Sequence, residues 1–485
     1  MFKFTHKDIV GGVHPLDDGK ALTRDCAVEP LSSLPPRLYL QLKQHPGDPA
    51  IPTVEVGETV QAGQLIAKSG GRFSAPIHAP LDGDIVAIDA ARIELKPAPT
   101  QQPLSTQKPA PIQQLSNEQR LDVIANSGIV GMGGAMFPLY DKLALVEKYS
   151  IKYLLINGSE CEPYMTCDDR VMREQSAQIV GGIRLLMEIT HAQQAIIGIE
   201  KNKPEAIAAL TDASSEDPKI SVHPLPALYP LGSSKQLIRA LTGIQLAPRA
   251  RSASYGVLVH NVASCVAVFR AFHFGHPMTH RIVTVSGRAI TRPANILAPI
   301  GTPASHLIAQ CGGFSEQPTQ MVFGGPMMGH PMYNVHQPIL KGTCGLLLLG
   351  ENEVALDMPT NCLRCGRCAN VCPMQLQPLH LLPLIQHEEF DTAKKLGLEQ
   401  CLSCGACAYV CPASLPLTAS FNWGRNELKK QRYMDQKAEF TRQAAASKQQ
   451  RLAEEAAQKA AAKAEKAAKR ASRSRRSATK EEEVS

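Results

Sequence analysis

The sequence predicts a multidomain protein of mixed α/β and α+β architecture, and three observations lead to this prediction. The chain has 485 residues, which is enough for about three or four domains. Apolar strand-like runs alternate with helical patterns in its central part, as they do in domains with a parallel sheet. Two dense cysteine runs follow, and a segment rich in Ala, Lys and Glu comes last.

Shifts in composition divide the chain into five regions. Apolar residues make up 44% of the chain and charged residues 20%, which is typical of soluble globular proteins with several cores. A linker rich in Pro, Gln and Thr, at 96–114, separates the first two regions. The predicted regions are a β-rich module (1–110), a Rossmann-like α/β domain (115–275), a small α+β domain (280–350), a cysteine-rich domain (355–424) and a tail (425–485).

The first region alternates apolar and polar residues over 54–67 and again over 74–88, with glycines at the turns. This pattern resembles the barrel-sandwich fold of lipoyl and biotinyl domains, which present a modified lysine on the hairpin between their two halves. The corresponding hairpin here reads Ser69-Gly-Gly-Arg72 and offers no such lysine. We therefore predict that this module is a structural adaptor.

Hydrophobic periodicity predicts the elements of the next two regions. Short apolar runs are expected to form buried strands, and longer periodic segments are expected to form helices. The expected elements are helices at 117–126, 139–149, 170–188 (a crossover helix) and 303–310, and strands at 153–156, 195–199 and 281–287.

The tail accounts for most of the net charge of +7. From Thr441 onward the chain has 12 Lys/Arg and 6 Asp/Glu residues, whereas the other 440 residues have 39 and 38. The nearly neutral body gives no support to a nucleic-acid role. Helix propensity in the tail is high, but it lacks the apolar seam that a coiled coil needs. We expect a solvated or partly disordered helix.

Nothing in the sequence predicts a membrane span. The longest apolar stretch, 255–272, is interrupted by His260, Asn261 and Arg270, so we expect a buried helix or strand there. The N-terminal residues lack the apolar stretch of a signal peptide, and the 14 cysteines therefore indicate a reducing cytosol rather than a disulfide framework. If the protein works at a membrane, we expect other subunits to hold it there.

Eight of the cysteines form two runs with the same spacing. In each run three cysteines are separated by two residues, and a fourth precedes a proline. This is the ligand pattern of two [4Fe–4S] clusters, in which the fourth thiolate usually binds the other cluster. We assign one cluster to Cys362, Cys365, Cys368 and Cys411, and the second cluster to Cys401, Cys404, Cys407 and Cys372.

The alternative for these cysteines is structural zinc. Structural zinc sites are built from two separated ligand pairs in a tetrahedral array. A triple cysteine run followed by Cys-Pro, occurring twice, does not suit that geometry. Iron–sulfur clusters are therefore the stronger prediction, and paired clusters of this kind relay single electrons.

A glycine-rich loop, Gly131-Met-Gly-Gly-Ala-Met-Phe-Pro138, stands between two expected helices, with Lys142 four residues further on. Glycines let backbone N–H groups approach a phosphate or a ring closely, and the next helix N-terminus adds a favourable dipole. By itself such a loop is weak evidence, because a plain turn is about as common. Polar residues after the strand at 153–156, beginning at Asn157, strengthen the case, because α/β folds bind ligands there.

The ordered set of motifs resembles two related families. The loop at 131–138, Asn157-Gly-Ser-Glu-Cys-Glu-Pro163, Tyr229-Pro-Leu-Gly232 and His260-Asn-Val resemble the flavin- and NADH-binding subunit of respiratory complex I. A closer resemblance, over residues 1 to about 425, is to the C subunit of Rnf-type (Rsx) ion-translocating electron-transport complexes. The motifs shared with that family are Gly11-Gly-Val-His-Pro15, the loop at 131–138, the stretch 157–170, Gly324-Gly-Pro-Met-Met-Gly329 and both cysteine runs.

The resemblance implies a fold and a set of cofactor residues. The region 280–350 looks like the soluble-ligand-binding β-grasp domain of both families, and the cysteine region looks like a bacterial 2[4Fe–4S] ferredoxin. Phe137 and Glu162 would flank the nicotinamide of NADH, as the catalytic pair. By resemblance, FMN would bind to Gly131, Gly133, Gly134, Lys142, Asn157, Glu160, Tyr229, Gly232 and Asn261.

Several positions depart from the complex I pattern. Met132 and Met136 replace an arginine and a glycine in the loop, and Ser159 and Cys161 replace an aspartate and a serine. The acidic pair expected after Gly232 is Ser233-Ser234, so a carboxylate at the nicotinamide edge is missing. Either another residue replaces it, or the flavin exchanges electrons with something other than NADH.

The resemblance implies an ion-translocating oxidoreductase. The chain would be a peripheral subunit on the cytoplasmic side of a bacterial inner membrane, carrying FMN and two [4Fe–4S] clusters, with NADH as the hydride donor. Its partners would be the other subunits of the complex and ferredoxin, or a redox-regulated protein kept reduced by it. The alternatives are a soluble diaphorase module of a hydrogenase or formate dehydrogenase, and a cluster-only scaffold without flavin.

Overall fold

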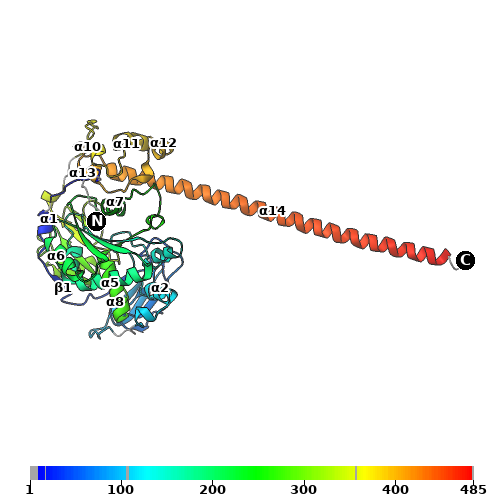
Figure 1. Cartoon of the computed structure of the whole chain (residues 1–485), viewed down its shortest axis with the longest axis horizontal. Helices are drawn as coiled ribbons and strands as arrows, with labels where there is room; N and C mark the ends of the chain where they lie inside the picture. Colours follow the sequence, from blue (N-terminus) through cyan, green and yellow to red (C-terminus); the bar gives the residue numbers. More distant parts are fainter. Residues whose placement is uncertain (1–8, 17, 105–108, 355–357, 483–485) are drawn as a thin grey trace. The chain divides into compact units, whose positions relative to one another are not determined.

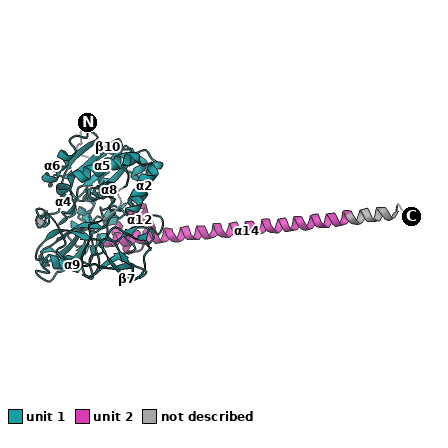
Figure 2. Cartoon of the chain, turned by 90° about the horizontal axis from the view of Figure 1, so that it is seen from below, with its two compact units in different colours: residues 1–380, 400–418 teal, residues 381–399, 419–485 magenta. Residues whose placement is uncertain are grey.

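The computed structural model describes residues 9–16, 18–104, 109–354 and 358–482, with side chains described up to residue 472. Four residues of the predicted linker, 105–108, and the first eight residues of the chain lie outside the described ranges. The chain divides into two compact units, Met1–His380 with Gln400–Thr418, and Leu381–Glu399 with Ala419–Ser485 (Figure 2).

Two small antiparallel sheets form the predicted β-rich module in the first unit. Burial alternates over Leu38–Gln41, where Leu38 and Leu40 are fully buried. The predicted alternation over 54–67 and 74–88 is only partly present, because residues 74–81 are all buried. One sheet has the order β2-β8-β7-β4 and the other β3-β5-β6. Their bounds are β2 Leu38–Gln41, β3 Ile51–Pro52, β4 Thr59–Val60, β5 Leu65–Lys68, β6 Ile77–His78, β7 Gly83–Ile88 and β8 Arg92–Pro97.

A parallel four-stranded sheet with the order β11-β10-β9-β12 forms the predicted Rossmann-like domain. Helices α5 and α8 pack against each other and cover one face, while α7 packs on the other (Figure 1). Both faces are therefore buried, as expected for parallel strands. The bounds are β9 Tyr153–Gly158, β10 Gln194–Glu200, β11 Ile220–Leu225, β12 Val257–Asn261, α4 Cys167–Glu174, α5 Ser176–Thr190, α6 Pro204–Ala213, α7 Ser234–Thr242 and α8 Val262–Phe274.

Two helix predictions need correction. The expected crossover helix at 170–188 is two helices, α4 and α5, because Gln175 has φ −132° and ψ 28°, outside the helical region. The helix expected at 139–149 is a short α3 (Leu139–Leu143) followed by a 3-10 turn (Ala144–Glu147). By contrast, α2 spans Asn117–Asn126 as predicted, behind a capping box.

A mixed six-stranded sheet with the order β1-β14-β13-β17-β15-β16 forms the predicted β-grasp region. Its edge strand β1 comes from the N-terminal part of the chain and pairs in parallel with β14, which the sequence did not indicate. The bounds are α1 Asp18–Ala21, β1 Val28–Pro30, β13 His280–Ser286, β14 Ala294–Pro299, α9 Ala304–Gln310, β15 Gln320–Phe323, β16 His330–Pro331 and β17 Gly345–Leu349.

The cysteine region contains two short helices, α10 (Arg367–Asn370) and α13 (Ala406–Tyr409). Each begins after a glycine in the left-handed region, with φ 76° at Gly366 and 78° at Gly405. A side chain is strained in that conformation, so the equivalent glycines mark an equivalent turn in both cysteine runs.

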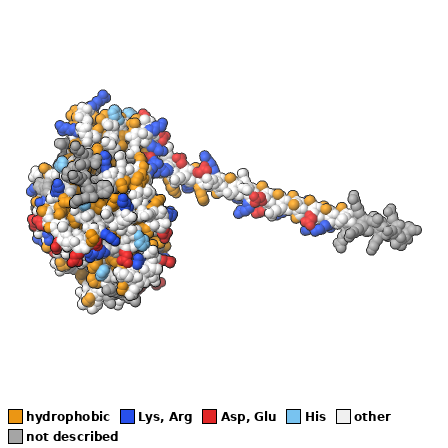
Figure 3. All heavy atoms as spheres, viewed as in Figure 1, with side chains coloured by type: hydrophobic (Ala, Val, Ile, Leu, Met, Phe, Trp, Pro, Cys, Tyr) orange, Lys and Arg blue, Asp and Glu red, His pale blue; other side chains and the backbone are white. Residues whose placement is uncertain are grey.

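The second unit has a small apolar core formed by Leu381, Ile385, Leu398, Phe421 and Leu428. Its long helix α14 (Leu417–Glu482) has only exposed side chains from Lys429 to the end of the described side chains, and Lys/Arg and Asp/Glu alternate along it (Figure 3). This confirms the predicted solvated helix. The other helices of this part are α11 (Pro378–Gln386) and α12 (Phe390–Lys395).

In the described part of the chain, no helix combines the length and apolar character that a membrane span requires.

Candidate electron-transfer site

The glycine loop closes on itself between α2 and α3. The Gly131 N–H donates to the carbonyl O of Phe137 over 2.8 Å. A Cβ added at Gly134, where φ is 100°, would meet nothing within 4 Å, and one at Gly133 would meet only the Cβ of Asn261, at 3.8 Å. The backbone at these two glycines is therefore open to close approach by a ligand.

Contacts from two other elements anchor the loop. The Met132 N–H donates to Ser264 Oγ of α8 over 3.2 Å. Arg281 of β13, only 3% exposed, donates from Nη2 to the Met132 carbonyl O at 2.9 Å and from Nε to the Thr343 carbonyl O at 3.2 Å. The β-grasp sheet thus fixes the loop of the Rossmann-like domain.

Lys142, the expected anion-binding lysine, lies on α3. Its Nζ donates to the carbonyl O of Val259, near the carboxyl end of β12. Burial lowers the pKa of Lys142 to about 8, and burial together with Lys142 holds the pKa of His260 well below its usual value. The lysine therefore lies at the ligand-binding edge of the sheet, where its charge is weakly solvated.

The expected asparagines lie at the carboxyl ends of two adjacent strands, where Asn157 of β9 and Asn261 of β12 are register partners. Asn157 Nδ2 donates to the Gly232 carbonyl O over 2.8 Å. Asn261 Oδ1 accepts from the Ala263 N–H at 2.9 Å and so caps α8, while its Nδ2 donates to Asp168 Oδ2 at 2.5 Å. The structure thus brings Asn157 together with Gly232, and Asn261 together with Gly133.

Glu160 has a structural role. It has φ 47°, and its carboxylate accepts the N–H groups of Asp168 (2.6 Å) and Asp169 (3.1 Å) at the start of α4. Lys20 reaches the same segment and donates to the carbonyl O atoms of Glu160 and Glu162, each at 2.8 Å. Sequence reasoning missed Lys20, because it lies 140 residues away and belongs to no motif.

Glu162 lies where the Rossmann-like domain meets the Gly324–Gly329 loop. Its Oε2 accepts from the Met327 N–H over 3.2 Å, while its buried Oε1 has no partner in the described part of the chain. A Cβ at Gly325 would lie 2.2 Å from Oε2, so a side chain there would displace the Glu162 carboxylate from this position. Burial raises the pKa of Glu162 to about 7, which places its titration in the neutral range.

Phe137, the other expected catalytic residue, packs against the barrel-sandwich module. Its ring centroid lies 5.2 Å from that of Phe73, and the Arg72 guanidinium lies 4.6 Å from the Phe73 ring. The hairpin that carries a modified lysine in lipoyl domains therefore contacts the glycine loop here, which agrees with the predicted adaptor role.

Tyr229 faces the cysteine region. It is 1% exposed, and its hydroxyl donates to the carbonyl O of Cys404 over 2.6 Å. Three residues later, Gly232 lies beside Cys161, since an added Cβ would be 3.0 Å from Cys161 Sγ. Burial raises the pKa of Cys161 to about 12, so this thiol stays protonated at neutral pH. The 229–232 segment thus joins the expected flavin residues to the second cysteine run.

Seven of the eight cysteines of the two runs lie close to others in two groups. Burial raises the pKa of Cys407 to about 12, and the nearby thiols of Cys401, Cys404 and Cys372 raise it further. Burial likewise raises the pKa of Cys368, with Cys411 and Cys362 close enough to add to it. Cys372 thus lies among the second set and Cys411 among the first, as in the predicted crossed arrangement.

Backbone geometry around these thiols suits cluster ligation. The N–H groups of Arg364 and Ser403, both with positive φ, donate to Cys362 Sγ and Cys401 Sγ over 3.4 Å in each case. The N–H of Leu376 donates to Cys372 Sγ over 3.3 Å. Hydrogen bonds to the sulfurs are the contacts by which proteins tune iron–sulfur clusters, so the residues present fit two [4Fe–4S] groups.

Buried polar atoms without partners surround the expected flavin residues. Ser233 stands at the N-cap of α7, yet its hydroxyl makes no capping bond. Unsatisfied buried groups of this kind are rare in folded proteins, and a bound ligand is one explanation for them. The atoms concerned are Ser159 Oγ, Glu162 Oε1, Ser233 Oγ and His260 Nε2.

The fold places an open glycine loop at the carboxyl edge of a parallel sheet, and Tyr229 connects the expected flavin residues to the second cysteine run. These are the features of a flavin- and iron–sulfur-containing electron-transfer protein. Family models agree with this class. They match the Nuo51 FMN-binding domain at residues 124–270, the RnfC barrel sandwich hybrid domain at 7–101, the SLBB domain at 282–331 and the 4Fe–4S dicluster domain at 361–415.

Curated relatives narrow the class to one family. The C subunit of the ion-translocating oxidoreductase complex of Rhodobacter capsulatus is 44% identical over 434 residues, covering 87% of this chain and 83% of the relative. The C subunit of the proton-translocating ferredoxin:NAD(+) oxidoreductase complex of Clostridium ljungdahlii is 40% identical, covering 80% and 87%. The Na(+)-translocating counterpart of Acetobacterium woodii is 34% identical, covering 80% and 89%.

The chain therefore belongs to the family of C subunits of ion-translocating oxidoreductase complexes. It is an electron-transfer subunit of an oxidoreductase, with FMN and [4Fe–4S] clusters as its cofactors. The family and cofactor predictions are confirmed, and the zinc, soluble-diaphorase and cluster-only alternatives are set aside. The roles of individual residues stay predictions.

Proposed function

We propose that this chain takes electrons from NADH at the flavin site and passes them singly to a partner of the complex, either ferredoxin or another redox protein. The relatives from C. ljungdahlii and A. woodii are subunits of complexes named for ferredoxin:NAD(+) oxidoreduction, which supports this proposal. Membrane subunits would couple the electron flow to ion movement.

One observation carries the proposal. Tyr229 donates to the backbone of Cys404, and the same segment places Gly232 beside Cys161 and Asn157. A single stretch of four residues, buried from Tyr229 to Leu231, thus links the proposed flavin residues to a proposed cluster ligand. Two redox centres that exchange electrons directly must lie close together, and this segment contacts the proposed residues of both.

FMN, when bound, accepts a hydride and releases electrons one at a time, which matches clusters that carry single electrons. Residues of this chain would hold FMN and the nicotinamide in position. Gly133 and Gly134 leave room for the ring system, and Arg281 holds the loop that carries them. Glu162 holds or releases a proton near pH 7 at the nicotinamide edge, in place of the carboxylates missing at Ser233 and Ser234.

We further propose an order for the two clusters. The second set includes buried Cys404, which Tyr229 contacts, whereas Cys362 and Cys365 of the first set are exposed. Electrons would therefore enter at the second set and leave at the first. The surface near the exit carries Leu363, 67% exposed, with Arg364 and Arg367 close by in sequence, which suits an acidic partner.

The location is proposed as peripheral, on the cytoplasmic side of a bacterial inner membrane, with other subunits of the complex holding the chain there. Family membership supports this placement. Co-purification with membranes only when the other subunits are co-expressed is the expected result. Recovery of the chain in the membrane fraction without them would contradict it.

Anaerobic addition of NADH to the purified holoprotein tests the input step. We expect the visible absorbance of bound flavin to bleach with NADH. Dithionite serves as the control, because it reduces flavin without a nucleotide site. Flavin that dithionite bleaches but NADH does not would move the entry point to another donor.

A further inference from the structure

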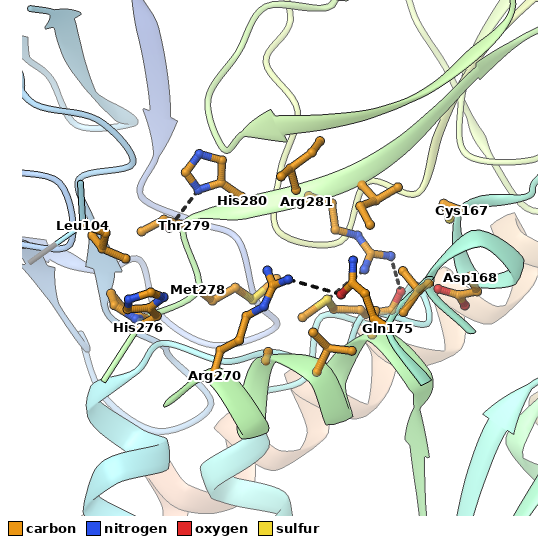
Figure 4. Close-up of a pocket in the computed structure, with 18 residues that line it drawn as sticks. Leu104, Cys167, Asp168, Gln175, Arg270, His276, Met278, Thr279, His280 and Arg281 are labelled. Carbon is orange, nitrogen blue, oxygen red and sulfur yellow. Dashed lines mark hydrogen bonds between the residues drawn. The ribbon is translucent and has the colours of Figure 1, made fainter. Parts of the chain in front are cut away.

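A cavity of about 200 Å³ lies in the first unit, between α4, α8 and β13 (Figure 4). None of the eleven residues proposed for FMN or NADH lines it. Arg270, in the wall of the cavity, is seven residues beyond Ala263 on α8, which is about 10 Å along the helix axis. The cavity therefore extends well away from the ligand-binding edge of the sheet.

The wall of the cavity is largely apolar. Side chains from the two helices and from the β-grasp sheet form it, and Met132 of the glycine loop closes one part. An apolar cavity of about 150 Å³ is large enough to hold benzene, so this one accommodates a ring-sized body. The apolar residues used in the argument are Val171, Val266, Met278, Ile282 and Leu297.

Arg270 brings an unpaired positive charge to this apolar wall. Its Nε donates to Gln178 Oε1 over 3.0 Å. Its Nη2 donates to Gln175 Oε1 over 3.3 Å (Figure 4), and both acceptors are neutral amides. In the described part of the chain it forms no ion pair, and its Nη1 has no hydrogen-bond partner. Burial lowers the pKa of Arg270, which shows that the charge is poorly solvated. Partly buried cations normally have an anionic partner.

The neighbouring groups leave the cavity net positive. Arg281 lines it as well and donates to backbone and sulfur acceptors. Among the lining residues, Asp168 is the one acid, and its Oδ1 has no partner in the described part of the chain. Glu160 lies within 4.8 Å of Asp168 but does not line the cavity. Burial and Arg270 lower the pKa of His280 to about 4 and also lower that of His276, so both imidazoles are neutral near pH 7. Two guanidinium groups thus face one carboxyl group.

We infer that this cavity binds a small organic monocarboxylate whose apolar body is about the size of one ring. Its carboxylate would pair with Arg270, and its body would lie against Val266 and Ile282. Because Met132 lines the cavity, the ligand would also contact the loop that carries Gly133 and Gly134. The inference goes beyond the proposed electron route and does not depend on it.

Calorimetric titration of the holoprotein with benzoate tests the site, with benzamide as the neutral probe of the same shape. We expect benzoate to bind, and benzamide to bind about 10-fold more weakly or worse, because the neutral amide cannot form an ion pair with Arg270. Arg270→Gln should weaken benzoate binding by about the same factor. Arg184→Gln, which removes a half-exposed arginine on α5, is the matched control and should not change it.

Val266→Phe provides a second variant that keeps every charge. The larger side chain should fill the cavity and abolish binding, so the proposal stays testable even if Arg270→Gln folds poorly. Equal affinity of wild type and Val266→Phe, equal affinity for benzoate and benzamide, or no benzoate binding at millimolar concentration would each overturn the inference. Loss of FMN from Arg270→Gln would do so too, because the cavity would then belong to the flavin site.

Discussion

At the scale of single residues, Lys20 holds the backbone of the segment that carries two of the residues proposed for the flavin site, Glu160 and Glu162. Its ammonium donates to the carbonyl O atoms of Glu160, Glu162 and Met165 over 2.6–2.8 Å and so fixes the segment after β9. Charged hydrogen bonds are strong in a buried setting, and removing the donor leaves several acceptors unsatisfied. The segment that positions Glu162 therefore depends on a residue of the N-terminal region.

Lys20→Met should lower the free energy of unfolding by about 3 kcal/mol, the cost of losing buried charged hydrogen bonds, and should also lower flavin occupancy. Thermal denaturation and the flavin-to-protein ratio measure the two effects. Lys219→Met, the same change at an exposed position, is the control. Unchanged flavin content in Lys20→Met would show that the segment holds its shape without the lysine.

The raised pKa of Glu162 leads us to expect that the rate of flavin reduction depends on pH. Burial raises its pKa to about 7, so it is protonated below that pH and negatively charged above it. The negative charge favours the positive nicotinamide of NAD⁺ that forms when hydride leaves. The rate of flavin reduction by NADH should therefore rise as pH increases through about 7. Stopped-flow absorbance across this range measures the rate.

In Glu162→Gln the rise should disappear and the rate should stay about 10-fold lower, since one well-placed ionised group contributes at least about 1.4 kcal/mol. Glu118→Gln, on the exposed first turn of α2, controls for a change of net charge. A Glu162→Gln enzyme with the wild-type pH profile would exclude Glu162 as the titrating group.

At the scale of elements, α14 separates into two parts. Phe421 and Leu428 are buried in the core of the second unit, whereas side chains from Lys429 onward are exposed. Arg432 still forms an ion pair with Glu399 of the second unit. Beyond it, exposed ion pairs such as Lys469–Glu465 contribute only about 0.3–0.5 kcal/mol each, so that part of the helix adds little to the stability of the folded body.

Truncation after Met434 keeps the ion pair of Arg432 with Glu399 and should therefore leave the melting temperature, iron content and flavin content of the protein unchanged. Truncation after Ser420 removes Phe421 and Leu428 and should destabilise the second unit by about 2–5 kcal/mol for each large apolar side chain lost from its core. Calorimetry of both variants measures the difference. Equal destabilisation by the two truncations would mean that the distal helix packs on something.

Elements were predicted correctly where the sequence contains a strong local signal, such as a helix cap or a regular cysteine spacing. The helix at 117–126 was bounded correctly because Ser116 and Gln119 form a capping box. The cysteine spacing indicated the two clusters, in agreement with the 4Fe–4S dicluster match at 361–415. The break at Gln175 was not predictable, because no Gly or Pro marks it. Likewise β1 pairs three residues with β14 across more than 260 positions, and Arg281 reaches Met132 from another domain. Such contacts leave no periodic trace in the sequence.

At the scale of the whole molecule, the order of the clusters can be tested by removing one. Cys365→Ala removes a proposed ligand of the first cluster, whose cysteines Cys362 and Cys365 are exposed. It should lower the iron content by about four atoms per chain, which is the iron of one [4Fe–4S] cluster. Flavin reduction by NADH should survive, whereas electron transfer to an external protein acceptor should fail. Cys404→Ala, in the set beside Tyr229, should also slow reoxidation of the flavin. Acceptor reduction that persists in Cys365→Ala would contradict the proposed exit.

The central claim is that electrons from NADH reach both cysteine-bound clusters through this chain alone. Low-temperature EPR of the purified holoprotein, frozen after anaerobic addition of NADH, tests it most directly. The proposed route predicts reduced-cluster signals that appear with NADH and match those produced by dithionite. The proposed route would be contradicted if a protein that contains flavin, iron and labile sulfide gave cluster signals with dithionite and none with NADH.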